Sequence, residues 1–248
     1  MKYLVGDIGN TFIKLSILNE RFEISKEYNL ETSKIFIKKN RDKFLSNIKK
    51  TKLKKQVLFS SVVPKAFKVI KNILSKKKFK VKEIKNLKIK KILKIKVKNY
   101  NQLGSDRISN ALGALKFKNS LIIDFGTATT FDIVKNRVYE GGIISPGVKL
   151  SILNLHKSTA LLPMINLKKF KNNFGKNTKE AINAGFFWGY EGLINNIIKK
   201  ISFKTKTNYK IILTGGYAKL FSKYVHQKSI IDENITIKGI SKAYRELL

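Results

Sequence analysis

The feature that most constrains the fold is a short pattern that occurs twice: an apolar strand, then Asp-x-Gly with a polar residue, then a second strand. The first copy lies at residues 7–11 and the second at residues 124–128. The flanking runs are apolar and partly β-branched, as is typical of strands: 3–5 and 12–18 in the first half, 121–125 and 131–134 in the second. We therefore expect an α/β protein built from a duplicated unit.

Apolar periodicity and turn residues predict the remaining elements. We expect helices over 33–55, 65–78, 108–115, 148–161 and 179–201, and strands over 56–63 and 210–213. The 108–115 helix is expected to be capped at Ser105 or Asp106. Residues 80–98 alternate Lys with apolar residues, which predicts half-buried strands at a sheet edge. The boundary between the halves is expected near 100–106, giving an N-terminal half, 1–103, and a C-terminal half, 104–248.

The chain of 248 residues carries a formal net charge of +36. Such a charge raises the question of nucleic acid or an anionic membrane as partner. However, 47 of the 52 basic residues are lysines, so the guanidinium groups that suit phosphates and base edges are scarce. The lysine-rich strip 80–98 also lacks interleaved aromatic residues for base stacking. A solvated lysine coat is therefore the preferred interpretation, and a nucleic-acid strip ranks second.

The inventory of reactive residues excludes several classes of site. There is no Cys, and His156 and His226 are the two histidines, so zinc clusters, thiol nucleophiles and disulfides are ruled out. No apolar run reaches the roughly 18 residues of a membrane span, and the N-terminus lacks the order of a signal peptide. We expect a soluble, cytoplasmic protein with neither a membrane nor a nucleic acid as its partner.

The two Asp-x-Gly turns, together with the glycines 215–216 after a late strand, suit phosphate groups and a metal ion. Glycines let backbone N–H groups approach an anion, Asn10 and Thr11 add donors, and the carboxylates can hold a divalent cation through water. Asp7 and Asp124 could instead be plain turn residues. Their equivalent places in a duplicated unit favour a nucleotide cleft.

The sequence lacks the signature motifs of other nucleotide-binding folds. No Gly-x-x-x-x-Gly-Lys-Ser/Thr sequence is present, and no Gly-x-Gly-x-x-Gly follows the first strand, which disfavours P-loop enzymes and dinucleotide dehydrogenases. Phosphoryl transfer without a P-loop needs a carboxylate near the acceptor hydroxyl. Asp106 is the candidate, and Arg107 could hold an anionic group of the substrate. The alternative is that Asp106 only caps a helix.

Seven short motifs follow one another along the chain. They are Asp-Ile-Gly-Asn-Thr at 7–11, Gly-Ser-Asp-Arg at 104–107, Asp-Phe-Gly-Thr-Ala-Thr-Thr at 124–130, Gly-Gly-Ile-Ile-Ser-Pro-Gly at 141–147, Thr-Ala-Leu-Leu-Pro at 159–163, Gly-Lys-Asn-Thr at 175–178 and Thr-Gly-Gly at 214–216. Their order is that seen in type III pantothenate kinases, which this chain resembles from end to end. The resemblance implies two ribonuclease-H-like halves around a nucleotide cleft, as in acetate and sugar kinases, Hsp70 and actin. It also implies a homodimer that makes 4′-phosphopantothenate from pantothenate and ATP, the first step of coenzyme A biosynthesis.

The resemblance further implies roles for individual residues. Asp106 would be the general base, and Asp124 would help to hold the required monovalent cation, K⁺ or NH₄⁺. Asp7 would lie near Mg²⁺, through water, and Thr178 would reach pantothenate from the partner subunit. The residues implied to bind ATP are Asp7, Ile8, Gly9, Asn10, Thr11, Phe12, Ile13, Lys14 and Thr127. Those implied to bind pantothenate, besides Thr178, are Gly104, Ser105, Asp106 and Arg107.

The chain departs from the family pattern just before Gly104. Many relatives have a Tyr seven residues before this Gly, where this chain has Val97, and Asn99-Tyr100 replaces the usual Asn-Pro. The departure bears on the local pantothenate contacts. An alternative function is a regulatory or coenzyme-A-sensing protein of the same fold, and another is a lysine-driven nucleic-acid binder. Trp188 and Tyr190 are interpreted as helix core or dimer interface.

Overall fold

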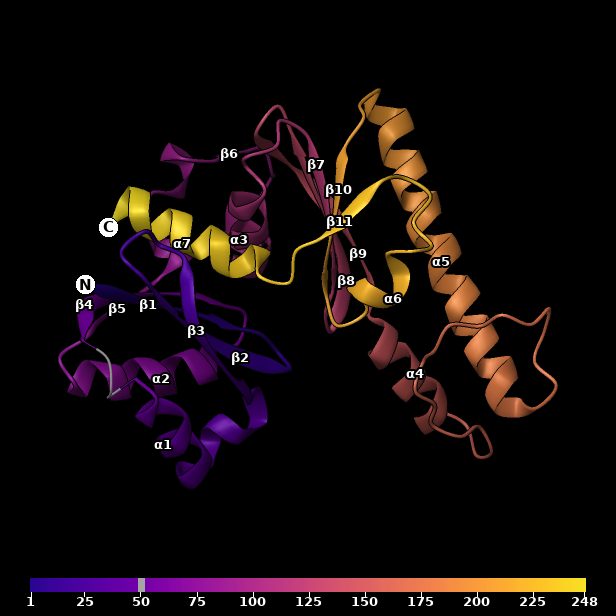
Figure 1. The fold of residues 1–248 in the computed structure, drawn as a ribbon, viewed down its shortest axis with the longest axis horizontal. Helices are drawn as coiled ribbons and strands as arrows, with labels where there is room; N and C mark the ends of the chain where they lie inside the picture. The colour runs from indigo at the N-terminus through magenta and orange to yellow at the C-terminus, as the bar shows by residue number, and fades with distance from the viewer. Residues whose placement is uncertain (49–51) are drawn as a thin grey trace. The chain divides into compact units, whose positions relative to one another are not determined.

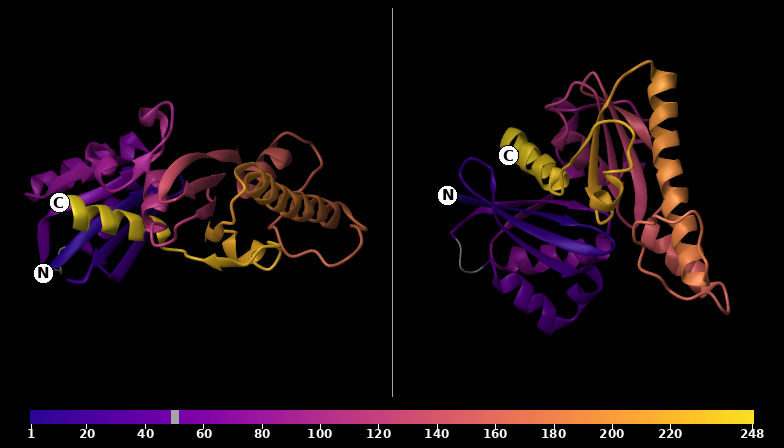
Figure 2. Two further views of the ribbon diagram at one scale, coloured as in Figure 1. Left: turned by 90° about the horizontal axis from the view of Figure 1, so that it is seen from above. Right: turned by 45° about the vertical axis from the view of Figure 1, so that its right-hand side comes forward.

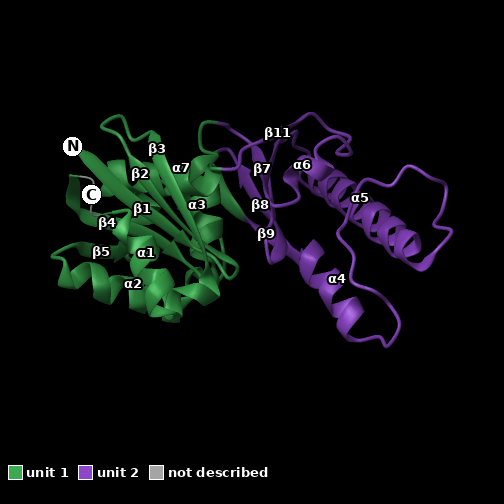
Figure 3. Cartoon of the chain, turned by 60° about the horizontal axis from the view of Figure 1, so that its bottom comes forward, with its two compact units in different colours: residues 1–116, 137–140, 234–248 green, residues 117–136, 141–233 purple. Residues whose placement is uncertain are grey.

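The computed structural model describes residues 1–48 and 52–248 and forms two compact units (Figure 3). Unit 1 comprises Met1–Lys116, Arg137–Glu140 and Asn234–Leu248, and unit 2 comprises Phe117–Asn136 and Gly141–Glu233. The compact units thus divide the chain at other places than the predicted halves 1–103 and 104–248. That division into duplicated halves stays a prediction.

Unit 1 contains a five-stranded mixed sheet in the order β3-β2-β1-β4-β5. The antiparallel meander β1–β2–β3 supplies one side, and β4 and β5 add in parallel to β1 on the other. The strands are β1 (Lys2–Ile8), β2 (Phe12–Leu18), β3 (Ile24–Glu31), β4 (Leu53–Ser61) and β5 (Lys80–Glu83). Because β1, β4 and β5 run in parallel, their carboxyl ends meet at one edge of the sheet.

Helices cover both faces of this sheet (Figure 1). On one face α1 (Lys38–Ser46) and α2 (Pro64–Lys76) bury apolar side chains against the strands, in a core that includes Ile13, Phe59 and Ile70. On the other face lie α3 (Ser105–Gly113) and α7 (Ile235–Leu247). Short 3₁₀ turns and one short strand complete the unit: η1 (Thr32–Phe36), η2 (Ile84–Asn86), η3 (Ile89–Lys91), η4 (Tyr100–Gln102) and β6 (Lys94–Ile95).

Helices α3 and α7 cross in unusually close contact, although they are far apart in the chain. A Cβ atom at Gly239 would lie 1.8 Å from the carbonyl oxygen of Ser109, and one at Gly113 would lie 2.2 Å from that of Ile235. Only glycine leaves room for this approach at either position. The C-terminal helix also reaches the first strand, where Tyr244 packs edge-on against Tyr3. The ribbons of this helix and of the N-terminal strands lie side by side in Figure 2.

Unit 2 repeats the strand topology of unit 1. Its strands follow the order β9-β8-β7-β10-β11, with β7–β8 antiparallel and β7–β10 and β10–β11 parallel. They are β7 (Ser120–Phe125), β8 (Ala128–Lys135), β9 (Val138–Pro146), β10 (Lys210–Gly215) and β11 (Ser229–Ile231). The first residues of β9, Val138 and Tyr139, belong to unit 1 and pair with β6 there. The shared topology confirms the expected fold class of duplicated α/β units.

Three helices pack in unit 2: α4 (Val148–Lys157), the long α5 (Thr178–Thr205) and the short α6 (Ala218–Phe221). Buried residues of α5, including Phe187, Ile194 and Ile198, pack with β7 and β10 in one core. Phe187 and Tyr190 are buried, as expected for helix core, whereas Trp188 is 43% exposed and meets the edge of Phe170. In the described part of the chain, no helix is both long and apolar enough to cross a membrane.

The structure corrects several predicted elements. The helix predicted over 33–55 is wrong: η1 and α1 occupy 32–46, β4 begins at Leu53, and residues 49–51 lie outside the described residues. The 148–161 helix ends at Lys157, and the first strand continues through Ile8 because Asp7 pairs with Lys14 of β2. The N-cap of α3 is Gly104, since Ser105 and Asp106 already belong to the first helical turn. Residues 80–98 form two short edge strands, but 3₁₀ turns separate them.

The α3–α7 crossing predicts a strong effect of one added methyl group. Gly239→Ala should destabilise the protein by about 2 kcal/mol or more, because the new Cβ overlaps the backbone of Ser109. Urea unfolding followed by circular dichroism measures this change. The control is Arg245→Ala, which removes an exposed side chain of the same helix and should change stability by no more than about 0.5 kcal/mol. Equal stability of the two variants would contradict the close crossing.

Candidate functional site

The carboxyl edge of β1, β4 and β5 gathers the motif residues of unit 1. Ile8, the last residue of β1, lies opposite Ser61 of β4, and the N–H of Val62 donates to the carbonyl oxygen of Ile8 at 3.0 Å. The Asp-x-Gly turn after β1 and the segment that leads into α2 are therefore neighbours. In open α/β sheets ligands bind at the carboxyl ends of parallel strands, so this edge is the candidate site.

Asp7 and Lys14 face each other across the β1–β2 pair. Side chains of directly opposed residues project from the same face of a sheet, so the predicted carboxylate and ammonium groups stand side by side. Lys14 Nζ lies 3.3 Å from Glu27 Oε1 and 3.3 Å from Asn234 Oδ1. The carboxylate of Glu27 and the amide of Asn234, which stands just before α7, thus fix the position of the Lys14 ammonium group.

The turn itself is tight and open to solvent. The N–H of Gly9 donates to the carbonyl oxygen of Phe12 at 3.0 Å, and Asn10 and Thr11 between them are exposed. Ile8 and Ile13 are fully buried, so of the residues predicted to bind ATP these two can offer only backbone groups. An anion-binding turn requires hydrogen-bond donors that are open to solvent and held in place by a buried support. Asn10 and Thr11 are such exposed residues, and Ile8 and Ile13 supply the buried support.

Asp106 lies in the first turn of α3, directly after Gly104. Its Oδ1 accepts the backbone N–H of Arg107 at 2.8 Å. A Cβ at position 104 would lie 2.3 Å from the same oxygen, so glycine is needed there to leave the carboxylate in place. Burial raises the pKa of Asp106 above its ordinary value, against the lowering effect of the Arg107 N–H and charge. A carboxylate with a raised pKa accepts protons more readily near neutral pH.

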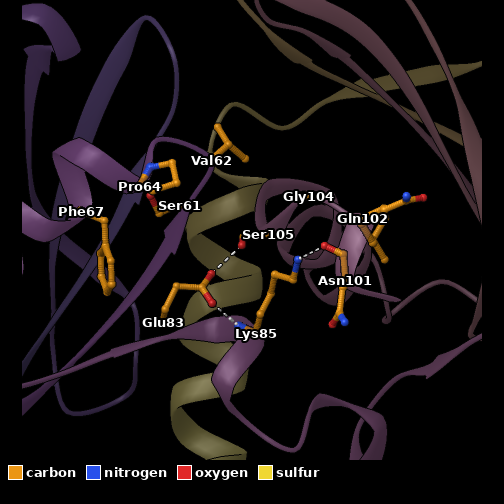
Figure 4. Close-up of a pocket in the computed structure, with 11 residues that line it drawn as sticks. Ser61, Val62, Pro64, Phe67, Glu83, Lys85, Asn101, Gln102, Gly104 and Ser105 are labelled. Carbon is orange, nitrogen blue, oxygen red and sulfur yellow. Dashed lines mark hydrogen bonds between the residues drawn. The ribbon is translucent and has the colours of Figure 1, made fainter. Parts of the chain in front are cut away.

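A cavity of about 330 Å³ opens beside the start of α3 (Figure 4). Glu83, at the end of β5, points at Ser105 and accepts its hydroxyl hydrogen, while the N–H of Lys85 donates to the other carboxylate oxygen at 2.7 Å. Burial raises the pKa of Glu83, and the Ser105 hydrogen bond partly offsets this rise. The residues around the cavity are Ser61, Val62, Pro64, Phe67, Glu83, Lys85, Asn101, Gln102, Leu103, Gly104 and Ser105.

The departure from the family pattern lies beside this cavity. The ammonium group of Lys85 is 5.9 Å from the ring centre of Tyr100 and donates to the carbonyl oxygen of Asn101 at 2.8 Å. Tyr100 opens η4, which leads into Gly104. An aromatic ring is thus present next to the cavity, three residues after Val97.

Sequence reasoning missed Glu83, Lys85 and Ser61 as lining residues of the cavity. One signal was available for Glu83, since it is the one acidic residue in the lysine-rich stretch 80–98. A lone carboxylate among lysines indicates a position where a negative charge has a specific polar partner. Ser61 and Lys85 carried no comparable signal, because serines and lysines are common on either side of them.

In unit 2 three glycine-containing turns meet around Asp124 and Thr127. A Cβ at Gly147 would lie 2.0 Å from the carbonyl oxygen of Thr127, and one at Gly215 would lie 2.7 Å from Asp124 Oδ1 and 2.6 Å from the carbonyl oxygen of Phe125. The N–H of Gly216 donates to that last oxygen at 3.1 Å. Three motifs that are far apart in the sequence therefore form one site in this unit.

The donor atoms present suit some cations better than others. Within 1–48 and 52–248 no cluster of three or more His, Asp or Glu side chains could hold a metal ion. Asp124 Oδ1 and the carbonyl oxygen of Phe125 both lie close to Gly215. Carboxylate and carbonyl oxygens are ligands that hard cations prefer. Thr178 lies exposed at the start of α5, where Asn177 caps the helix by accepting the N–H of Glu180.

Comparison with known proteins gives concordant results. The family model for type III pantothenate kinase matches residues 3–200. The type III pantothenate kinase of Pelagibacter ubique is 46% identical over 97% of both chains, and that of Fusobacterium nucleatum is 34% identical over 96% of this chain and 97% of its own.

Solved structures match over almost the whole chain at low identity and therefore show the fold alone. A Campylobacter jejuni protein assigned to the Baf family of transcriptional activators has a TM-score of 0.61 at 19% identity and 98% coverage of both chains. The ethanolamine utilization protein EutJ of Carboxydothermus hydrogenoformans has a TM-score of 0.57 at 11% identity, with coverage of 98% and 89%. A Cytophaga hutchinsonii protein assigned as a sugar kinase has a TM-score of 0.52 at 14% identity, with coverage of 99% of this chain and 100% of its own, so the chain has the fold of the sugar kinases. The family model covers residues 3–200 of this chain, and two type III pantothenate kinases are 46% and 34% identical to it over almost its whole length. This chain therefore belongs to the type III pantothenate kinases, phosphotransferases that use ATP to phosphorylate pantothenate in the first step of coenzyme A biosynthesis.

Proposed function

We propose that Asp106 is the general base that accepts the proton of the pantothenate hydroxyl as this oxygen attacks the γ-phosphorus of ATP. The observation that carries the proposal is a partly buried carboxylate with a raised pKa, held by the Arg107 N–H at a helix start that borders a cavity. The O–H bond of pantothenate breaks as the new O–P bond forms, and ADP leaves.

The cavity beside α3 is the proposed pantothenate pocket. Its volume of about 330 Å³ suits a small polar acid, and Gly104 and Ser105 line it. Glu83 and Ser105 hold each other by a hydrogen bond, which fixes the wall next to Asp106. Arg107 supplies a cation for the substrate carboxylate, and Thr178 of the partner subunit completes the pocket.

The proposed ATP contacts lie in the Asp7–Lys14 segment of unit 1 and at Thr127 of unit 2. The exposed Asn10 and Thr11, the turn amides and the Lys14 ammonium group suit the phosphates. Asp7, opposite Lys14, would hold Mg²⁺ through water. When bound, Mg²⁺ neutralises charge on the phosphates and orients them.

Asp124 is the proposed ligand of a monovalent cation, K⁺ or NH₄⁺. The support is the convergence of Asp124 Oδ1 and the Phe125 carbonyl oxygen on Gly215, whose φ of +84° is one that glycine adopts readily. Oxygen ligands of low total charge suit a monovalent ion better than a divalent one.

A homodimer is proposed through unit 2. Many of its large apolar side chains are exposed, among them Ile144, Leu161 and Trp188. On α5, Gly185, Gly189 and Gly192 have nothing within 4 Å of their Cβ positions and recur at helical spacing near Trp188. Exposed large apolar side chains that share one surface mark an interaction site, and helix glycines allow another backbone to approach.

The reaction is tested by release of ADP from ATP and Mg²⁺. We expect release to depend on pantothenate and to be faster in potassium than in sodium buffer, because the cation site selects by size and ligand geometry. Asp124→Asn should lose most of the potassium stimulation. No release in either buffer from folded wild-type protein would contradict the proposed function and favour the regulatory alternative.

The base role is tested by Asp106→Asn. The turnover number should fall by about 10² to 10⁴-fold, the usual contribution of a general base, while ATP binding measured by calorimetry is retained. The matched control is Asp42→Asn, which neutralises an exposed carboxylate of α1 and should leave turnover unchanged. Wild-type-like turnover of Asp106→Asn would remove Asp106 from this role.

The same variant should also gain stability at neutral pH. The pKa of Asp106 is raised in the folded state, so the folded protein binds this proton more tightly than the unfolded chain does, and the group destabilises the fold as pH rises through the raised pKa. Asparagine cannot ionise, so the Asp106→Asn variant lacks this destabilising contribution. The melting temperature of Asp106→Asn should exceed that of wild type at pH 7–8, and the difference should shrink towards pH 4. A difference that grows towards pH 4 would contradict the assignment.

The dimer is tested by sedimentation velocity. Gly189→Glu meets nothing within 4 Å in the single chain, so the variant should fold normally but sediment as a monomer, because the longer side chain and its charge keep the partner helix away. Lys68→Glu, on the exposed side of α2, should remain dimeric. A monomeric wild type, or a dimeric Gly189→Glu, would count against this interface.

A further inference from the structure

Thr32 forms two hydrogen bonds to the turn that follows β1, although it lies 23 residues after Gly9 in the chain. Its hydroxyl Oγ1 donates to the carbonyl oxygen of Gly9 at 2.7 Å, and its backbone N–H donates to that of Thr11 at 2.9 Å. Thr32 directly follows β3, whose last residue Glu31 lies opposite Phe12. The pairing of β2 with β3 therefore delivers Thr32 to the turn.

The side chain of Thr32 is buried, and its hydroxyl has a fixed hydrogen-bond partner. The residue is only 4% exposed, and it begins η1, which packs against α1 and α2. A buried hydroxyl that donates to a backbone carbonyl at 2.7 Å is fixed in orientation. The Thr32 hydroxyl thus belongs to the rigid part of unit 1, whereas Asn10 and Thr11 are exposed.

The two hydrogen bonds determine which way the turn presents its dipoles. Carbonyl oxygens repel phosphate oxygens, and here the carbonyls of Gly9 and Thr11 both point towards Thr32. In a planar trans peptide the N–H points opposite to the C=O. The N–H groups of Asn10 and Phe12 are therefore directed away from Thr32, with the partial positive charge that an anion prefers.

We propose that Thr32 is a positioning residue for nucleotide binding: it turns the two carbonyls of the 9–12 turn away from the ATP phosphates and so aims the turn amides at them. The inference rests on the proposed function of this turn. Thr32 makes no contact with substrate in this scheme and acts through Gly9 and Thr11.

The decisive variants separate the hydroxyl from the shape of the side chain. Thr32→Val keeps the branched shape but cannot donate to Gly9, and Thr32→Ser keeps the hydroxyl. A hydrogen bond of this kind contributes roughly 0.5–1.5 kcal/mol, which corresponds to about a 2- to 12-fold change in an equilibrium constant. We expect Thr32→Val to weaken ATP binding, measured by calorimetry without pantothenate, and to raise the KM for ATP by a factor in this range. The KM for pantothenate should stay unchanged, and Thr32→Ser should restore ATP binding to within about 2-fold of wild type.

Ser25→Ala is the matched control. Ser25 lies near the start of β3, at the end of the β2–β3 pair away from the turn, and its hydroxyl donates to the carbonyl oxygen of Ile17 on β2 at 3.0 Å. Its loss tests the general effect of removing such a bond and should leave ATP binding unchanged. Thr32→Ala serves as a second variant without a hydroxyl if thermal unfolding shows that Thr32→Val does not fold.

The outcomes are distinguishable. ATP binding by Thr32→Val equal to that of wild type would overturn the inference about Thr32 alone. An equal rise of both KM values, or equal losses of ATP binding in Thr32→Ser, Thr32→Val and Ser25→Ala, would show a merely structural role and would also overturn it. Wild-type protein that binds no ATP would overturn the proposed function and, with it, this inference.

Discussion

The parallel pairing of β1 with β4 sets the position of everything else in unit 1. With Ile8 opposite Ser61, the turn after β1 and the wall of the cavity start from neighbouring backbone positions. A shift of one residue would turn the alternate side chains of β1 to the other face, so that Asp7 would enter the apolar core that now contains Ile8. The buried face of the sheet therefore fixes the register, and the register places the polar groups.

Local patterns were sufficient for part of this molecule. Strands β1 and β7, helix α2 and the buried strand β10 could be predicted because each carries its own periodicity or turn signal. The repeated Asp-x-Gly pattern also gave the duplicated topology. Helix α7 was not predicted, although its buried residues recur at helical spacing. Its return to β1 and α3 is a contact between distant parts of the chain that no local pattern reveals.

The remaining site residues depend on contacts between distant parts of the chain. Thr32 faces the turn because β3 pairs with β2, and Glu83 meets Ser105 because β5 ends beside α3. Neither neighbour is visible in a local window. The error in the 33–55 helix has a similar origin, because apolar residues spaced for one helix here serve a 3₁₀ turn, a short helix and the following strand. Family resemblance named the motif residues but not the side chains that hold them in place.

The return of α7 to the first sheet has a consequence for how the chain is made. Residues 234–248 leave the ribosome after all of unit 2, yet they cover the face of the sheet that carries Asp7 and lie against the helix that carries Asp106. Until residues 234–248 have been synthesised, that face of the β1–β5 sheet is not covered by α7. Unit 2 is contained between these segments and needs nothing that follows it, so we expect it to fold first during synthesis, with the N-terminal unit completed last.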